Sequence, residues 1–148
     1  MRKDQILLTI KSLHMLNAHG FLANIFTILS DHKISIDVIS TSEVSVALTV
    51  DGSAGNAHGA HPFSNPELRK ELEAFADVAV EEDLTLVTLV GPNLSQHVGA
   101  VQKVIAALDE VPLRLICQGA SASNVSFLMP SAKAADVVAS LHHQFIER

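Results

Sequence analysis

The stretch ISIDVISTSEVSVALTVD, residues 34–51, contains an alternation that decides the local fold. Apolar residues fill every even-numbered position from Ile34 to Val38 and again from Val44 to Val50. This period of two is typical of strands with one buried face. Because the polar residues Ser40–Glu43 separate the two runs, the stretch predicts two strands joined by a short turn.

The polar positions of this hairpin include two acids and a hydroxyl, namely Asp37, Glu43 and Ser35. Two interpretations are open. The side chains keep a solvent-facing sheet surface polar, or they hold a positively charged ligand. The charge pattern alone favours the first interpretation.

A different periodicity precedes the hairpin. Residues Gln5–Ser12 have the composition of a strand, and Asn17–Gly20 have that of a turn. In FLANIFTILSDH, apolar residues then recur at the spacing of one helix face. The residues that we expect this helix to bury are Leu22, Ile25, Phe26 and Leu29.

The start of that helix is a candidate binding site for an anion. Its first backbone N–H groups lack intrahelical partners and lie at the positive end of the helix dipole. Gly20 also lets the backbone approach a ligand closely. In a ferredoxin-like unit, we expect Ser35 and Asp37 at the start of the second strand to lie beside this turn, with Glu43 at the hairpin end. Amide donors near two carboxylates suit a zwitterion with an additional positive charge, such as a basic amino acid.

The rest of the first half completes one folding unit. Residues 51–66 combine Gly, Ala, Ser, Asn and Pro without periodicity, which predicts a surface loop. We expect a helix over Pro66–Phe75, capped by Asn65, and a short strand near Asp77–Glu82. The resulting order, β-α-β-β-α-β, is typical of a ferredoxin-like unit.

The second half repeats this order. A shift of 79 positions superimposes the first strand, the turn glycine, the helix and the hairpin, which indicates an internal repeat. The matched pairs are Leu7 with Leu86, Thr9 with Thr88, Gly20 with Gly99, Leu29 with Leu108, Ser42 with Ser121, and Val46 with Val125. The elements expected are strands at Leu84–Val90, Leu113–Gln118 and Val125–Met129, a helix burying Val101, Val104, Ile105 and Leu108, and a last helix near residues 132–146, capped by Ser131 and burying Ala134, Val137, Val138, Leu141 and Phe145.

This second unit ends without a closing strand. The simplest explanation is a strand upstream of Met1, which would make the chain a fragment of a larger protein. The sequence thus predicts an α+β fold with two ferredoxin-like (βαββαβ) units in tandem. The first covers residues 1–83 and the second, which is incomplete, covers residues 84–148.

Composition argues against several classes of protein. An apolar content of 48% excludes a disordered chain. No apolar run is long enough for a membrane helix or a signal peptide, so we expect a cytoplasmic protein without a membrane partner. A net charge of −6 and the absence of Trp and Tyr argue against a nucleic-acid partner. Cys117, in the apolar run RLIC, is expected to be buried and inert.

The His residues do not form a recognisable active site. His58 and His61 lie in the loose loop, with no Cys or carboxylate at ligand spacing beside them, and a solvated loop is the favoured reading. The chain also lacks a nucleophile elbow and a phosphate-binding loop. We therefore predict no catalytic residue, no metal ligand and no cofactor in this chain. A small enzyme that uses the His residues and Asp37 is the least favoured hypothesis.

A family resemblance rests on several of these segments. Residues 12–51, SLHMLNAHGFLANIFTILSDHKISIDVISTSEVSVALTVD, resemble the first ACT domain of the aspartate kinases, and the lysine-sensitive class in particular. The later segments LVTLVG, RLICQGAS and NVSFLMP resemble the second ACT domain of those enzymes. The likeness covers nearly the whole chain and includes both the GFL turn and the TSEVSVALT run.

The resemblance implies a regulatory chain that does not itself catalyse a reaction. In the parent enzyme, a preceding kinase domain would use ATP and Mg to phosphorylate the β-carboxylate of aspartate. The first ACT domain would be inserted within the second, so that a strand preceding residue 1 completes the second domain. A free-standing tandem ACT regulator that senses another ligand through partner binding is the alternative.

The resemblance also implies a ligand and its site. Lysine would bind where the first ACT domains of a homodimer meet, and would inhibit the kinase by feedback. The amides of Phe21 and Leu22 would meet its carboxylate, and Asp37 and Glu43 its ammonium groups. Ala18 stands where many relatives have Ser, which removes one hydroxyl contact. The implied lining residues are Met15, Ala18, Gly20, Phe21, Leu22, Ser35, Ile36, Asp37, Thr41, Ser42 and Glu43.

Overall fold

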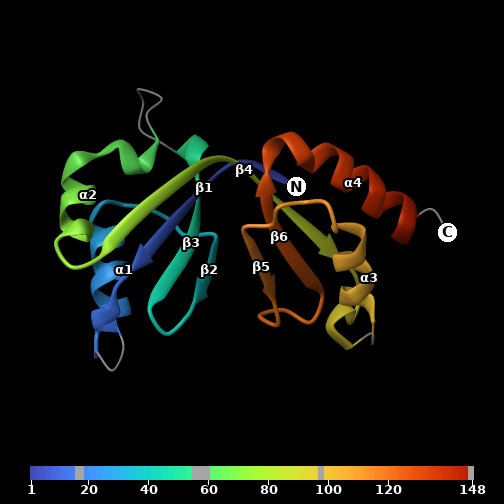
Figure 1. The fold of residues 1–148 in the computed structure, drawn as a ribbon, viewed down its shortest axis with the longest axis horizontal. Coiled ribbons are helices and arrows are strands. Elements are labelled where there is room, and N and C mark those ends of the chain that lie inside the picture. The colour runs from blue at the N-terminus through green and yellow to red at the C-terminus, as the bar shows by residue number, and fades with distance from the viewer. Residues whose placement is uncertain (16–18, 55–60, 97–98, 147–148) are drawn as a thin grey trace. The chain divides into compact units, whose positions relative to one another are not determined.

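Two compact units, each with its own apolar core, make up the chain (Figure 1). The computed structural model describes residues 1–15, 19–54, 61–96 and 99–146. The first unit comprises Asp4–Glu82, and the second comprises Met1–Lys3 together with Asp83–Arg148. The sequence predicted units at residues 1–83 and 84–148, so residues 1–3 and Asp83 are grouped differently in the structure.

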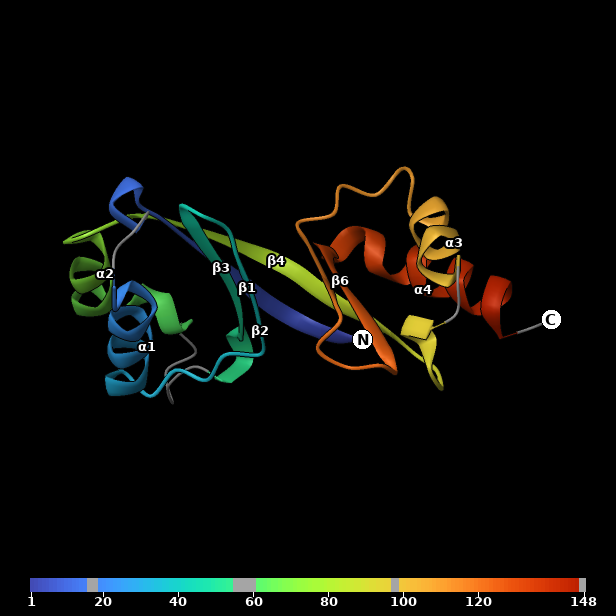
Figure 2. The same ribbon diagram turned by 90° about the horizontal axis from the view of Figure 1, so that it is seen from below.

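The first unit has the strand order expected of a ferredoxin-like fold. Its strands follow one another as β2-β3-β1-β4, and β3 is antiparallel to both β1 and β2. Figures 1 and 2 show both of its helices on one face of this sheet. The elements are β1 (Arg2–Lys11), α1 (Phe21–Asp31), β2 (Val38–Thr41), β3 (Ser45–Asp51), α2 (Pro66–Glu73) and the start of β4 (Asp77–Val90).

Helix α1 buries a different set of residues from the one predicted. Phe21, Ile25 and Leu29 are buried in the core of the first unit. Leu22 and Phe26, predicted to be buried, are 36% and 38% exposed. The i, i+3, i+4 spacing is compatible with more than one helix phase, and packing against the sheet selects the stripe that starts at the first helical residue, Phe21.

The predicted hairpin is present, but its first strand is shorter than expected. Pairing in β2 begins at Val38, and the residues from Ile34 onward precede it without strand structure. Ile34 and Ile36 nevertheless pack, partly buried, against the core, which explains their apolar alternation. The backbone N–H of Asp37 donates to the carbonyl of Thr49 at 2.9 Å, so contact with β3 starts one residue before the strand.

The second unit repeats the helix and hairpin of the first. Its strands are ordered β4-β6-β5, and β6 is antiparallel to both neighbours. Figures 1 and 2 show α3 and α4 on one face of these strands. The elements are the end of β4, α3 (Ala100–Ala107), β5 (Leu115–Gln118), β6 (Asn124–Pro130) and α4 (Ser131–Phe145).

Two details of these helices correct the prediction. Ile105 of α3 is 45% exposed, whereas Val104 and Leu108 are buried. Ser131 is the first residue of α4 rather than its cap, and Pro130 precedes it. The Ser131 hydroxyl instead hydrogen-bonds the Thr85 hydroxyl at 2.8 Å. The inward face of α4 is as predicted, since Ala134, Val137 and Leu141 are buried and Val138 and Phe145 pack against the same core.

The strands predicted near residues 77–82 and 84–90 are one strand, β4. Asp83, within it, has a φ of 57°, and Asp4 within β1 has a φ of 54°. Positive φ is uncommon for any residue except Gly, and Asp tolerates it better than most. The two aspartates are separated by the repeat distance, and the division between the units falls at both of them. A sequence pattern of apolar residues does not report such a local change in backbone direction.

The short segments between the strands contain more structure than expected. Asn65 caps α2 as predicted, because its side chain accepts a hydrogen bond from the N–H of Glu67 at 2.9 Å. His61 is half-buried rather than solvated: its Nδ1 accepts from the N–H of Phe63 at 3.1 Å, and its Nε2 lies 2.8 Å from Glu82 Oε1. His58 lies outside the described residues. The remaining short elements are the 3-10 turns η1 (Leu13–Met15), η2 (Gly52–Ala54), η3 (Pro62–Ser64) and η4 (Leu94–Gln96).

Cys117 is less buried than expected. It is half-buried, because it lies on β5, the last strand of the strand order. Within the described residues, every helix is too short or too polar to cross a lipid bilayer.

Candidate effector site

The N-terminal end of α1 has the backbone geometry predicted for anion binding. Gly20 precedes the helix with φ 83° and ψ 3°, a left-handed conformation that suits Gly. Its carbonyl accepts the first helical hydrogen bond, from Asn24 N–H at 2.9 Å. The N–H groups of Phe21 and Leu22 fall within the first turn, where an α-helix supplies no acceptor. These two donors, together with Gly20, are called the amide end below.

The β2–β3 hairpin lies at the same end of the first unit as the amide end. Lys11, the last residue of β1, pairs with Ser45, the first residue of β3. The N–H of Ser12 also donates to the carbonyl of Val44 at 2.9 Å. In Figure 1 the turn between β2 and β3 and the start of α1 both lie at the lower end of the first unit. Glu43, which is exposed in this turn, therefore lies at the same end of the first unit as the amide end, as predicted.

Asp37 and Ser35 do not lie beside the amide end, where the sequence predicted them. Strands β1 and β2 are both antiparallel to β3 and hence parallel to each other, so β2 begins at the end opposite to the amide end. Asp37 contacts Thr49, and Thr49 pairs with Leu7. Leu7 precedes Lys11 by four strand residues, which corresponds to about 13 Å along the strand. Asp37 is thus separated from the amide end of its own unit.

The backbone of Asp37 is nevertheless held against β3. Asp37 is half-buried, and its Oδ2 atom is shielded from solvent, whereas Ser35 is exposed. Thr49, which is fully buried, accepts the Asp37 N–H with its carbonyl and the Val38 N–H with its hydroxyl at 3.2 Å. Thr49 was missed by sequence reasoning, because Thr is common in strands and only the strand register reveals its partner.

The hydroxyl of Ser42 forms hydrogen bonds within the β2–β3 turn. The hydroxyl accepts the N–H of Ser45 at 3.1 Å and lies 2.6 Å from the Ser45 hydroxyl. This local bonding is typical of Ser in turns. In the second unit, the Ser121 hydroxyl accepts the N–H of Ser123 at 3.2 Å in the corresponding turn. Ser42 thus stabilises the hairpin, and a contact with a ligand stays a prediction.

The other predicted lining residues differ in accessibility. Thr41 is exposed at the end of β2, Leu22 is 36% exposed, and Ile36 is half-buried against the core. Met15 ends the turn η1, and Ala18 lies outside the described residues. Their contribution to a site stays a prediction.

The second unit keeps the turn but not the carboxylates. Gly99 precedes α3 with φ 81° and ψ −4°, as Gly20 does for α1. The N–H of Arg114 donates to the carbonyl of Leu128 at 2.8 Å, as Asp37 does to Thr49. Leu128 follows Thr49 by the repeat distance of 79 residues, so the strand register puts Arg114 in the place of Asp37. Arg114 follows Asp37 by only 77 residues, and the repeat is therefore two residues shorter at β5. A cation in place of the carboxylate makes this half unsuited to an ammonium group.

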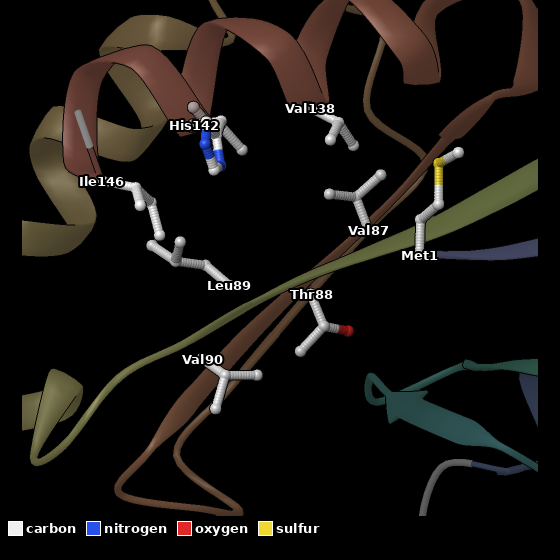
Figure 3. Close-up of a pocket in the computed structure, with 9 residues that line it drawn as sticks. Met1, Val87, Thr88, Leu89, Val90, Val138, His142 and Ile146 are labelled. Carbon is white, nitrogen blue, oxygen red and sulfur yellow. The ribbon is translucent and has the colours of Figure 1, made fainter.

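A pocket in the second unit is also unsuited to an amino acid. It has a volume of about 210 Å³ and lies between β4 and α4 (Figure 3). Val87 and Leu89 point toward α4, while Val138, His142 and Ile146 reach down from that helix. Among the described residues that line it, none has a carboxylate to pair with an ammonium group. Within the described residues, no group of three or more His, Cys, Asp or Glu side chains is placed to hold a metal ion.

Comparison with known proteins identifies the family. The family model of the ACT domain matches residues 8–57 and 87–145. The chain belongs to the ACT domain family. The two matched segments correspond to the two structural units, so each unit is an ACT unit.

The relatives of this ACT chain are aspartokinases. It is 45% identical over 147 residues to "Lysine-sensitive aspartokinase 3" of Escherichia coli K12, covering 99% of this chain and 32% of that protein. The chain therefore spans about a third of the length of that relative. It is also 33% identical to "Aspartokinase 2, chloroplastic" of Arabidopsis thaliana, covering 99% of this chain and 28% of that protein. The resemblance to the aspartate kinases, noted from the sequence, is confirmed.

Solved structures agree with the sequence relatives. A crystal structure of E. coli aspartokinase III in complex with lysine and aspartate, in the T-state, has a TM-score of 0.84 and 44% identity, covering 98% of this chain and 32% of that one. A C-terminal regulatory domain of aspartate kinase from Porphyromonas gingivalis W83 has a TM-score of 0.79 and 27% identity. It covers 98% of this chain and 94% of that one, so the two chains have nearly the same extent.

Proposed function

We propose that this chain is the regulatory, amino-acid-sensing part of an aspartate kinase and that its first ACT unit binds lysine. The main support is the likeness, at 44% identity, to an aspartokinase solved in complex with lysine and aspartate. The first ACT unit also carries the required chemistry: amide donors at Phe21 and Leu22 for a carboxylate, and Asp37 and Glu43 for ammonium groups. The second unit has Arg114 in the place of Asp37.

The separation of the two halves supports a site formed between two copies of the chain. Asp37 lies about 13 Å along the sheet from the end where the amide donors lie, which is longer than a lysine molecule. One copy would therefore contribute the amide end and the other Asp37. Strand β2 ends the strand order of its unit, so its outer edge offers backbone groups for pairing with a second copy. A homodimer through the first ACT units satisfies both requirements.

In the parent enzyme, a kinase domain that uses ATP and Mg would precede this chain and phosphorylate aspartate in the cytoplasm. Lysine would inhibit it by binding one arrangement of the ACT dimer better than the other. The shift in activity is limited by that difference in affinity. This chain by itself would have no kinase activity.

A strand ahead of Met1 would complete the second ACT unit in that parent. Met1 lines the pocket between β4 and α4, and Met1–Lys3 already group with this unit. A strand that continued β1 backward would run beside Val87–Val90 and cover this apolar surface. The same strand would give the second unit the four-stranded order of the first.

Calorimetry of the 148-residue chain tests the proposal. Lysine should bind, and threonine, methionine and aspartate should bind more weakly or not at all. Asp37→Asn should weaken lysine binding by about 1.5–3 kcal/mol, roughly tenfold to a hundredfold, because a charge-assisted hydrogen bond is lost. Asp77→Asn is the matched control, since Asp77 is exposed on β4 of the same unit. A folded dimer that shows no heat with millimolar lysine would refute the proposal.

A further inference from the structure

Two aromatic rings meet directly behind the amide end. The rings of Phe21 and Phe75 have centroids 5.6 Å apart and planes at 85°, an edge-to-face arrangement. Phe21 is the first residue of α1 and is 8% exposed. Phe75 follows the end of α2 and packs, partly buried, against the same core. The ring pair therefore connects the start of one helix to the end of the other.

This contact holds the first residue of α1 against the residue that follows α2. A Cβ built on Gly20 would meet no atom of the described residues within 4 Å, apart from those of its chain neighbours. The backbone N–H of Phe21, a proposed lysine donor, belongs to the same residue as the anchored ring. An edge-to-face pair has a preferred geometry, because the positive ring edge faces the negative ring face. The position of the donor thus depends on the orientation of the ring.

The second ACT unit provides an internal comparison. Gly99 has nearly the same backbone angles as Gly20, and its carbonyl accepts from Lys103 N–H at 3.0 Å, as that of Gly20 does from Asn24. The residue that follows Gly99 is Ala100, which has no ring. The glycine turn therefore forms without an aromatic anchor. The anchor occurs in the unit that also has the carboxylates.

We propose that Phe75 is a positioning residue for the effector site, which acts through Phe21 by fixing the direction of the amide donors. This inference rests on the proposed lysine-binding function. Phe75 itself would not touch the ligand. Loss of its ring would leave the donors present but less well oriented, so that lysine binding weakens by more than the loss of stability explains.

The test compares Phe75→Leu with Phe63→Leu in the 148-residue chain. Phe63 is 5% exposed in the same core, so both changes replace a core ring by an aliphatic side chain. Calorimetry should show about threefold to tenfold weaker lysine binding for Phe75→Leu, from the energy of one aromatic pair. Phe63→Leu should bind lysine within about twofold of the original chain, even where urea unfolding shows an equal or larger loss of stability.

Two more measurements separate positioning from general loosening. Phe75→Tyr keeps the ring and should restore lysine binding to within about twofold. The N–H residual dipolar couplings of Phe21 and Leu22, which report bond direction, should change in Phe75→Leu and not in Phe63→Leu when recorded by NMR without lysine. Where Phe75→Leu fails to fold, Phe75→Met replaces it, since Met fills irregular space without a ring.

The outcomes are distinguishable. Equal lysine affinity in Phe75→Leu and the original chain, or equal weakening in Phe75→Leu and Phe63→Leu, would overturn the positioning role while leaving lysine binding intact. Failure of the original chain to bind lysine would instead overturn the proposed function itself.

Discussion

Replacing Gly20 by Ala isolates the contribution of one backbone conformation. The position has φ 83°, and a Cβ there would meet no atom of the described residues within 4 Å, its chain neighbours apart. The effect on stability therefore comes mainly from holding an L-residue in the left-handed region. That conformation costs about 1–2 kcal/mol. We expect this loss in the free energy of unfolding of Gly20→Ala.

Gly99→Ala provides the control, because Gly99 has φ 81° and a Cβ there would also meet no atom of the described residues within 4 Å, its chain neighbours apart. Urea unfolding followed by circular dichroism should give the same loss of about 1–2 kcal/mol at both positions. Calorimetry should then show weakened lysine binding for Gly20→Ala alone, because only the first ACT unit combines an amide end with carboxylates at the hairpin, Asp37 and Glu43, whereas the second unit has Arg114 in the place of Asp37. A loss below about 0.5 kcal/mol at both sites would refute the strain argument. Equal effects on lysine affinity would refute the assignment of the site to the first unit.

Three further predictions follow from other contacts. Lysine should bind with a stoichiometry of one per chain in calorimetry, since Arg114 replaces the carboxylate in the second unit; two per chain would contradict this. Ser42→Ala should lower the free energy of unfolding by about 0.5–1.5 kcal/mol through loss of its bond to Ser45, and an unchanged urea midpoint would show that water substitutes for it. His61→Ala should lower the free energy of unfolding by about 0.5–2 kcal/mol, because the acceptor for the Phe63 N–H is lost. Glu82→Gln should lower it by less than about 1 kcal/mol, because Glu82 is half exposed. A larger loss for Glu82→Gln than for His61→Ala in urea unfolding would show that the ion pair dominates.

The two halves of the candidate site were predictable to different degrees. The glycine turn before α1 is local: a Gly followed by an apolar helix pattern is sufficient to predict it, and it recurs at Gly99. The place of Asp37 is not local. It depends on β2 running parallel to β1, which puts the start of β2 at the opposite end of the sheet. The predicted position of Asp37 and Ser35 beside the turn was therefore wrong, and their role in a binding site stays a prediction.

Which helix residues are buried was also predictable only in part. An apolar stripe predicted that α1 and α3 are amphipathic, and both are. Which of two neighbouring stripes faces the sheet was not predictable, so Phe26 and Ile105 were assigned to the core although both are exposed. The two positions are equivalent in the repeat, so the same ambiguity was resolved in the same way in both units.

The sequence by itself determined the type and order of the elements, the internal repeat and the family, because these depend on the spacing of side chains along the chain. Tertiary structure alone decided the continuity of β4 through Asp83, the ring contact between Phe21 and Phe75, and the separation of Asp37 from the amide end. Each of these depends on the register and direction in which distant segments pack, and side-chain spacing within a segment contains no information about that register.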